Sequence, residues 1–256
     1  MLLPTVAIIA LASVALCVAV FIHWGTQWGS TPEERAAPMP GDEYLADSPS
    51  PRVVMTRALS VEAEPDTVWP WLAQLGRGAG FYSVDFLDNG KRTSARHIIS
   101  WVPAPARGDA SAIGYLREIT PGAAITWWVP GTSFLGAFAR LITDIRVRPR
   151  EGGSRLVIRM SADAKGPMAR PALWVFRFID SIMACTQLHR LKERAEAQGA
   201  RASDPECPET GSLEQFQHYE VIYASGERAG VRGKEDAARW HRAAVEAGLI
   251  RHTSSS

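Results

Sequence analysis

Cysteine and histidine provide most of the nucleophiles and metal ligands of proteins, and this chain has three cysteines and six histidines. No two cysteines have the C-x-x-C spacing of zinc or redox sites, and no two histidines form an H-x-x-x-H or H-E-x-x-H pair. The residues concerned are Cys17, Cys185, Cys207, His23, His97, His189, His218, His241 and His252. We therefore expect no metal site, no bound cofactor and no disulfide framework.

Two other motifs fail the spacing that their chemistry requires. Ser133 lies between Gly131 and Gly136, one residue too long for the G-x-S-x-G nucleophile elbow. Residues 76–80 read G-x-G-x-G, but they follow a predicted helix instead of a strand, and Phe81 stands where a dinucleotide loop has its last glycine. We interpret residues 76–80 as a bend between two short helices.

Charged residues are balanced, with 28 lysines and arginines against 27 aspartates and glutamates, for a formal net charge of +1. Nucleic-acid binders depend largely on neutralising phosphates, so this balance argues against a nucleic-acid partner. Hydrophobic residues make up 46% of the chain, which is enough for a sizeable core. A folded domain is therefore expected, and a disordered or fibrous chain is excluded.

The chain begins with an uncharged apolar stretch from Leu2 to Ile22. As a helix this stretch would be about 31 Å long, close to the roughly 30 Å of a bilayer core. Trp24 and Trp28 follow, and indoles favour the headgroup interface. A cleaved signal peptide would need a basic start and a shorter apolar core, and both are missing. Residues 1–23 are thus predicted to be a single-pass anchor in the cell membrane, with the side of the soluble domain open.

Residues 24–51 combine five prolines with glycine, serine and acidic residues. This composition resists regular structure and predicts a flexible tether.

The pattern over residues 52–200 is that of a mixed domain. Residues 52–63 alternate as a strand does, 65–75 have helical spacing, and 81–89 form a second short helix or turn. Four strand-like segments occupy residues 114–160, with a hairpin at 151–153, and the longest helical stretch runs from Pro171 to Gln198. Four arginines are predicted to share one face of the sheet, either facing solvent or forming an anion site: Arg146, Arg148, Arg155 and Arg159.

The last part of the chain, residues 201–256, reads as a polar linker followed by a strand at 219–225 and a helix at 234–247. This extension is too short for an independent core, so we expect it to dock on the main domain. Residues 211–256 are also the place where a protein partner could bind.

The order strand, two short helices, antiparallel strands and one long helix predicts an α+β helix-grip fold, with a curved antiparallel sheet wrapped around the long helix. The sequence strings make a resemblance specific. They are TPEERAAPMPGDEYLADSP from residue 31, TRALSVEAEPDTVWPWLAQLG from residue 56, GFYSVDFLDN from residue 80 and SARHI from residue 94. Over residues 31–200 the chain resembles the membrane-anchored branch of the SRPBCC superfamily, which includes START-type lipid carriers, the birch-pollen-allergen fold and polyketide cyclases.

This resemblance implies an apolar cavity between the sheet and the long helix, where a lipid or another hydrophobic small molecule would bind. We expect Tyr82, Asp85 and Asn89 at its mouth, unless they serve only as capping and turn residues. The other candidate ligand-binding residues are Trp127, Phe138, Phe176, Ile179, Asp180 and Met183. Asp180 lies three residues after Arg177, so it either forms a surface ion pair with Arg177 or places a charge in the cavity.

Three functions follow as hypotheses. The first is membrane-tethered binding, extending to transport, of a hydrophobic small molecule. The second is a polyketide cyclase or dehydratase in which Asp180 and Tyr82 would be the catalytic groups; it rests on the resemblance alone. The third is a scaffold that recruits a protein through the C-terminal extension.

Overall fold

The computed structural model describes residues 2–89, 91, 93–99, 102–109, 111 and 114–201. The strand and helix expected within residues 219–247, and the partner-binding segment 211–256, lie outside these residues.

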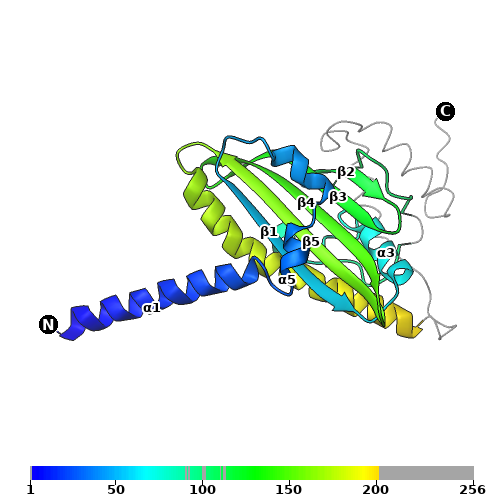
Figure 1. Ribbon diagram of the computed structural model, residues 1–256, viewed down its shortest axis with the longest axis horizontal. Coiled ribbons are helices and arrows are strands. Elements are labelled where there is room, and N and C mark those ends of the chain that lie inside the picture. Colours follow the sequence, from blue (N-terminus) through cyan, green and yellow to red (C-terminus); the bar gives the residue numbers. More distant parts are fainter. Residues whose placement is uncertain are drawn as a thin grey trace, which may run out of the picture.

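Five strands form one antiparallel sheet in the order β1-β5-β4-β3-β2. They are β1 (Arg52–Val61), β2 (Tyr115–Thr120), β3 (Ala124–Phe134), β4 (Ala137–Arg150) and β5 (Gly153–Lys165). The predicted hairpin is the tight β4–β5 connection, where Arg150 pairs with Gly153. The long helix α5 (Ala169–Arg201) lies across the curved sheet, as Figure 1 shows. The α+β helix-grip arrangement is therefore confirmed.

The main core fills the space between the sheet and the second half of α5. Leu188 and Leu191 of α5 are buried in one cluster with Ile145 of β4 and Leu156 of β5. A smaller cluster, rich in alanine, joins the first turns of α5 to the ends of β4 and β5. Its buried members are Ala137, Ala139, Ala162, Ala164, Ala169, Ala172 and Leu173. Because alanine side chains are short, the helix approaches the sheet closely at this end.

Two short helices cover the main core beside α5. Helix α3 (Pro65–Gln74) begins with proline, which suits a first helical turn, and buries Val68 and Trp71. The chain then bends at Gly76, whose φ of +67° favours glycine and whose Cβ would lie 2.7 Å from the Phe81 ring. Helix α4 (Asp85–Asp88) follows. The glycine-rich stretch is thus a bend between helices, as expected.

Helix α1 (Leu2–Gly25) is long and apolar enough to span a membrane between Val6 and Gly25. A cleaved signal sequence passes the same test of length and composition. Its described side chains are largely exposed as far as Val20, whereas Ile22 and Gly25 are buried. This burial marks the point where α1 packs against α5: the rings of Phe21 and Phe178 lie 5.4 Å apart between centroids.

The segment that was expected to be an irregular tether contains helix α2 (Pro32–Ala36) and the 3-10 helix η1 (Pro40–Leu45). Thr31 and Glu34 form a capping box at the start of α2. Leu45 and Met39 are buried on the outer face of the sheet, opposite α5. The expectation of a flexible tether is therefore wrong, because capping and apolar burial offset the effect of the prolines.

The same segment also pairs with the sheet. Strand β1 lies at the sheet edge, and its Thr56 and Ala58 amides donate hydrogen bonds to the carbonyls of Thr26 and Trp28, each at 3.0 Å. In this way the chain after α1 covers polar backbone groups that an edge strand would leave free.

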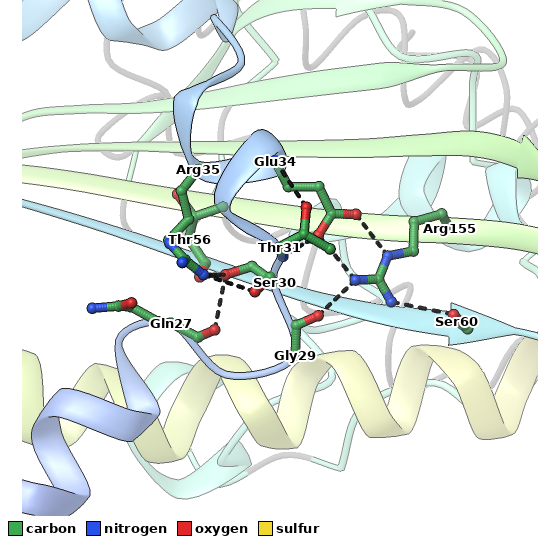
Figure 2. Close-up of polar contacts among 9 residues, drawn as sticks. All are labelled: Gln27, Gly29, Ser30, Thr31, Glu34, Arg35, Thr56, Ser60 and Arg155. Atoms are coloured by element: carbon green, nitrogen blue, oxygen red, sulfur yellow. Dashed lines mark hydrogen bonds and ion pairs between the residues drawn. The ribbon is translucent and has the colours of Figure 1, made fainter.

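The four arginines share the outer face, as predicted, but two of them face neither bulk solvent nor an external anion. Figure 2 shows the Arg155 guanidinium held by the carboxylate of Glu34 at 2.7 and 2.9 Å and by the carbonyl of Gly29 at 2.6 Å. Arg159 donates to the Asp42 carboxylate at 2.6 Å and to three carbonyls of α2 and the residue after it. The acidic segment is thus the anion that these arginines bind.

Candidate ligand-binding cavity

A cavity of about 100 Å³ lies between the sheet and the middle of α5. Its wall is mostly apolar and comes from β3, β4, β5, α5 and the residues around α3 and α4, including Leu75, Phe81, Trp127, Leu141, Met160 and Met183. Five polar side chains also line it: Ser83, Asp88, Thr143, Asp180 and Gln187. An apolar cavity with a few polar groups is the usual form of a small-molecule site.

Three of the polar groups are held by contacts within the protein. The Ser83 hydroxyl donates to the Met183 carbonyl at 3.0 Å, and the Gln187 amide donates to the Phe81 carbonyl at 2.6 Å. The Thr143 hydroxyl lies 3.1 Å from the Met160 sulfur. The first two bonds join α5 to the chain before α4, so they define the cavity wall more than they offer groups to a ligand.

Asp88, at the end of α4, is different. Its Oδ1 atom is buried and has no hydrogen-bond partner within the described part of the chain. Burial, with a smaller contribution from the nearby Asp85 carboxylate, raises the pKa of Asp88 from 3.8 to about 6. Asp88 is half-buried, and a side-chain hydrogen bond with Ser83 partly opposes the rise of its pKa. A carboxyl with one buried free oxygen and a raised pKa is typical of functional sites.

Trp127 of β3 provides the complementary atom. It pairs with Thr143 in the β3–β4 register and lines the cavity. Its indole Nε1 is buried and, among the described residues, has no acceptor. The same cavity wall therefore holds an unsatisfied acceptor on Asp88 and an unsatisfied donor on Trp127, and buried polar groups are normally satisfied.

Asp180 faces inward and does not form the surface pair with Arg177. Its carboxylate accepts from the Arg57 guanidinium of β1 at 2.5 Å, and the two side chains are 7% and 0% exposed. Arg57 also donates to the Gly25 carbonyl at 2.6 Å and to the Ser181 hydroxyl oxygen at 3.3 Å. The charge that Asp180 brings to the cavity wall is therefore balanced within the protein.

Tyr82 is buried but is not among the residues that line the cavity. Its hydroxyl oxygen accepts from the Gln74 amide at 2.6 Å, and its ring packs edge-on against Trp71. Burial raises the pKa of the Tyr82 phenol. The structure thus does not bring Tyr82 and Asp180 together as a catalytic pair.

Asp85 and Asn89 serve the local structure of α4. The Asp85 carboxylate accepts from the Ser94 hydroxyl at 2.5 Å and lies 3.5 Å from Arg190. Asn89 caps the helix, and its backbone amide donates to the Asp85 carbonyl. Neither residue lines the cavity. Both therefore take the capping and turn role, which was the alternative open in the sequence.

The remaining candidates divide by position. Trp127, Asp180 and Met183 line the cavity, whereas Phe138, Phe176 and Ile179 do not. Phe138 is 54% exposed and lies on the outer face, because it shares strand parity with the outward-facing Ile142. Phe176 packs edge-on against Phe134 beside the alanine-rich cluster, with ring centroids 6.2 Å apart. A single sequence does not fix the strand parity or the face of α5, so these three were chosen on residue type alone.

Asp88 is the main cavity residue that sequence reasoning missed. The string FYSVDFLDN contains two aspartates and an asparagine, and the sequence predicts Asp85 and Asn89 as the site residues. Asp85, which contacts Ser94 and Arg190, lies three residues before Asp88, which lines the cavity. Among the described residues no group of three or more histidines, cysteines, aspartates or glutamates could hold a metal ion.

No protein-family model and no curated protein sequence matches the chain. Solved structures do match. Protein NE0264 from Nitrosomonas europaea is 11% identical, with 63% of this chain and 99% of that chain covered and a TM-score of 0.38. The di-domain ARO/CYC StfQ from the steffimycin biosynthetic pathway is 11% identical, with 62% and 56% covered and a TM-score of 0.38. Ara h 8.0201 is 10% identical, with 57% and 99% covered and a TM-score of 0.36.

Identities and scores this low carry no information on ligand or activity.

Proposed function

We propose that this domain binds a hydrophobic small molecule in the cavity between the sheet and α5. The observation that carries the proposal is the pair of unsatisfied buried atoms in an apolar wall, Oδ1 of Asp88 and Nε1 of Trp127. Leaving such groups without partners costs about 1–3 kcal/mol each, which a bound ligand would recover.

The cavity supports a ligand that carries a hydroxyl group. A hydroxyl group both donates and accepts, so one hydroxyl on an apolar molecule can satisfy a carboxylate oxygen and an indole N–H. The volume of about 100 Å³ is below the roughly 300 Å³ at which ordinary ligand sites begin. The ligand is therefore small, or only its hydroxylated end enters the cavity. A larger ligand would require α4 to move away from α5.

We further propose that α1 anchors the domain in a membrane. Apolar molecules concentrate in bilayers, so an anchored binding domain meets its ligand at a high effective concentration. The contacts of Thr26, Trp28 and Glu34 with the sheet support a domain held firmly at the end of its anchor, in place of one swinging on a flexible tether.

The test is ligand recovery from the full-length chain, purified from membranes in mild detergent, by native mass spectrometry and organic extraction. Ala184→Leu fills the cavity, because Ala184 lines it. Ala172→Leu is the matched control, since Ala172 is a buried alanine of the same helix in the other cluster. We expect a stoichiometric apolar molecule in the wild type and the Ala172 variant, and loss of it in the Ala184 variant. The proposal is contradicted if the wild type and both variants carry no bound molecule and none of them binds a panel of apolar alcohols.

A second candidate function is catalysis, and the carboxyl of Asp88 is the observation in its favour. With a pKa of about 6, it is largely ionised at neutral pH yet basic enough to accept a proton from a bound molecule. If the protein is an enzyme, Asp88→Asn will abolish turnover while the extracted ligand remains bound. If the protein only binds, the same variant will change affinity and its pH dependence.

The scaffold hypothesis depends on residues 211–256. It stays a prediction, to be tested by whether deletion of these residues changes what copurifies with the protein.

A further inference from the structure

Large apolar side chains are exposed at one end of the domain. Leu135, Phe138, Met168 and Trp174 are 46–54% exposed, and we call these four residues the end patch. They come from the β3–β4 hairpin, the β5–α5 connection and the start of α5. The sheet register and packing place the hairpin and the β5–α5 connection at the same end of the domain, with Phe138 on the outer face there: Phe138 pairs with Lys165, and a Cβ on Gly136 would lie 3.7 Å from Met168 Cγ.

The tip of the hairpin is unusual for a turn in water. Leu135 and Gly136 are its two central residues, with φ of +47° and +74°. Two-residue hairpins with both φ values positive strongly prefer asparagine, aspartate or glycine at the first position. Leucine there is strained by its Cβ and is also 54% exposed. Backbone strain and exposure of an apolar side chain both destabilise the folded domain. Their combination at one position points to a role for the Leu135 side chain outside the domain.

The charged residues of the two segments that form the end patch are of one sign. Residues 131–140 and 164–179 contain no aspartate or glutamate. They contain four basic residues: Arg140, Lys165, Arg170 and Arg177. Arg140 is paired with Asp163, whereas Lys165 and Arg170 are exposed. An apolar centre with a basic rim matches the surface of a bilayer that contains anionic lipid.

The end patch continues the surface that α1 contacts. Trp174, Phe178 and Ile182 recur every four residues along α5, and the Phe21 ring of α1 packs on the middle one. In Figure 1 the first half of α5 extends from this junction towards the side on which the N-terminus of α1 lies. The junction is held by the Arg57–Gly25 hydrogen bond and by backbone bonds to β1. The direction of α1 therefore fixes which end of the domain faces a membrane.

We propose that the end patch inserts into the headgroup and upper acyl region of the same bilayer that α1 spans, with anionic lipid around its basic rim. The inference rests on the proposed anchoring by α1. It adds a second contact, which holds the domain tilted against the bilayer.

The test measures depth at four single-cysteine positions in the full-length chain, reconstituted in vesicles of phosphatidylcholine and phosphatidylglycerol. With Cys185→Ala and Cys207→Ala, the native Cys17 is the single cysteine, and its exposed position on α1 reports on anchoring. Leu135→Cys, or Phe138→Cys as a second reporter, tests the end patch in a cysteine-free background. Glu151→Cys is the matched control, because it is exposed at the opposite hairpin. Each cysteine carries a bimane fluorophore, which is quenched by iodide from water or by brominated lipid from the acyl region.

We expect brominated lipid to quench Cys17 and both end-patch reporters, and iodide to quench only Glu151→Cys. Adding Leu135→Asn to the Phe138→Cys protein creates a favourable Asn-Gly turn and removes the apolar tip, so lipid quenching at position 138 should fall. Lipid quenching of Cys17 with iodide quenching of positions 135 and 138 would overturn the inference and leave anchoring intact. Iodide quenching of Cys17 as well would overturn both. Disulfide-linked dimers through position 135, shielded from both quenchers, would assign the patch to a second copy and overturn the inference.

Discussion

Arg57 of β1 and Asp180 of α5 form a buried ion pair that joins the edge of the sheet to the long helix, with 2.5 Å between nitrogen and oxygen. The same guanidinium donates to the Gly25 carbonyl at the C-terminal end of α1, where a helix dipole favours a positive charge. One arginine therefore connects the proposed anchor, the sheet and the cavity wall. Through Arg57 the end of α1 is linked to Asp180 of the cavity wall.

Asp180→Asn should destabilise the protein strongly, because it leaves the Arg57 charge buried without its counter-charge. Breaking one partner of a buried pair typically costs about 3–5 kcal/mol of unfolding free energy. The double variant Arg57→Met, Asp180→Leu should recover much of this loss, because it leaves no buried charge. The measurement is chemical denaturation of the full chain in detergent. As a control, Arg107→Ala should cost less than about 1 kcal/mol, since its pair with Glu118 is largely exposed.

Equal effects of Asp180→Asn and Arg107→Ala would show that the charge of Asp180 is screened.

The sequence could not have named this pair. It gave Asp180 a nearby partner in Arg177, whereas the true partner is 123 positions away in the chain. Periodicity reveals which residues are helical, but it does not say which distant strand a helix covers.

The same limit explains the other differences. Strand alternation, proline and glycine positions and one long apolar helix were enough to predict the sheet, α3, α5 and α1, because these signals are local. The N-terminal segment was misjudged because its order comes from distant partners: Arg155 for Glu34 and Arg159 for Asp42. Within the cavity, residue type alone selected Trp127 and Met183 together with Phe138, which faces the other way.

Gly41→Ala should detach η1 from the outer face of the sheet. An added Cβ would lie 2.2 Å from Cγ2 of Ile142 and 2.4 Å from Oδ2 of Asp144, and the Gly41 amide donates to that carboxylate. Overpacking of this kind costs about 1–3 kcal/mol. Limited proteolysis of the full chain should show faster cleavage between α1 and β1. Ala36→Ser, on an exposed residue of the same segment, should leave the rate unchanged. Unchanged cleavage of Gly41→Ala would mean that the segment does not depend on this contact.

Gly25→Ala should separate the end of α1 from α5, because its Cβ would lie 2.6 Å from the Cβ of Ser181. The expected loss is about 1–3 kcal/mol of unfolding free energy. Ser181→Gly removes the opposing atom at a cost of about 1 kcal/mol for glycine in a helix. In denaturation experiments the double variant should therefore be more stable than Gly25→Ala alone. Simple addition of the two losses would contradict close packing at this junction.

Asp88 should make the protein less stable as the pH rises. The pKa of Asp88 is about 6 in the folded state, against an ordinary value of 3.8. Between these values the folded chain keeps a proton that the unfolded chain releases, so the free energy of unfolding falls as the pH increases through this window. Asp88→Asn cannot ionise, and its stability relative to the wild type should rise over the same window and level off above about pH 6.

The difference between the two proteins is the quantity to measure, because other carboxyls titrate too. The pKa of Asp144 is also raised to about 6 by burial, whereas the pKa values of Glu34 and Asp163 are lowered. Asp144→Asn is the matched comparison, since Asp144 lies on the outer face with Gly41 and Thr126. Both variants should flatten the stability profile, but only Asp88→Asn should also remove the pH dependence of ligand affinity. A stability difference between wild type and Asp88→Asn that stays constant from pH 4 to 7 would place the Asp88 carboxyl in water, and the cavity would lose its principal polar group.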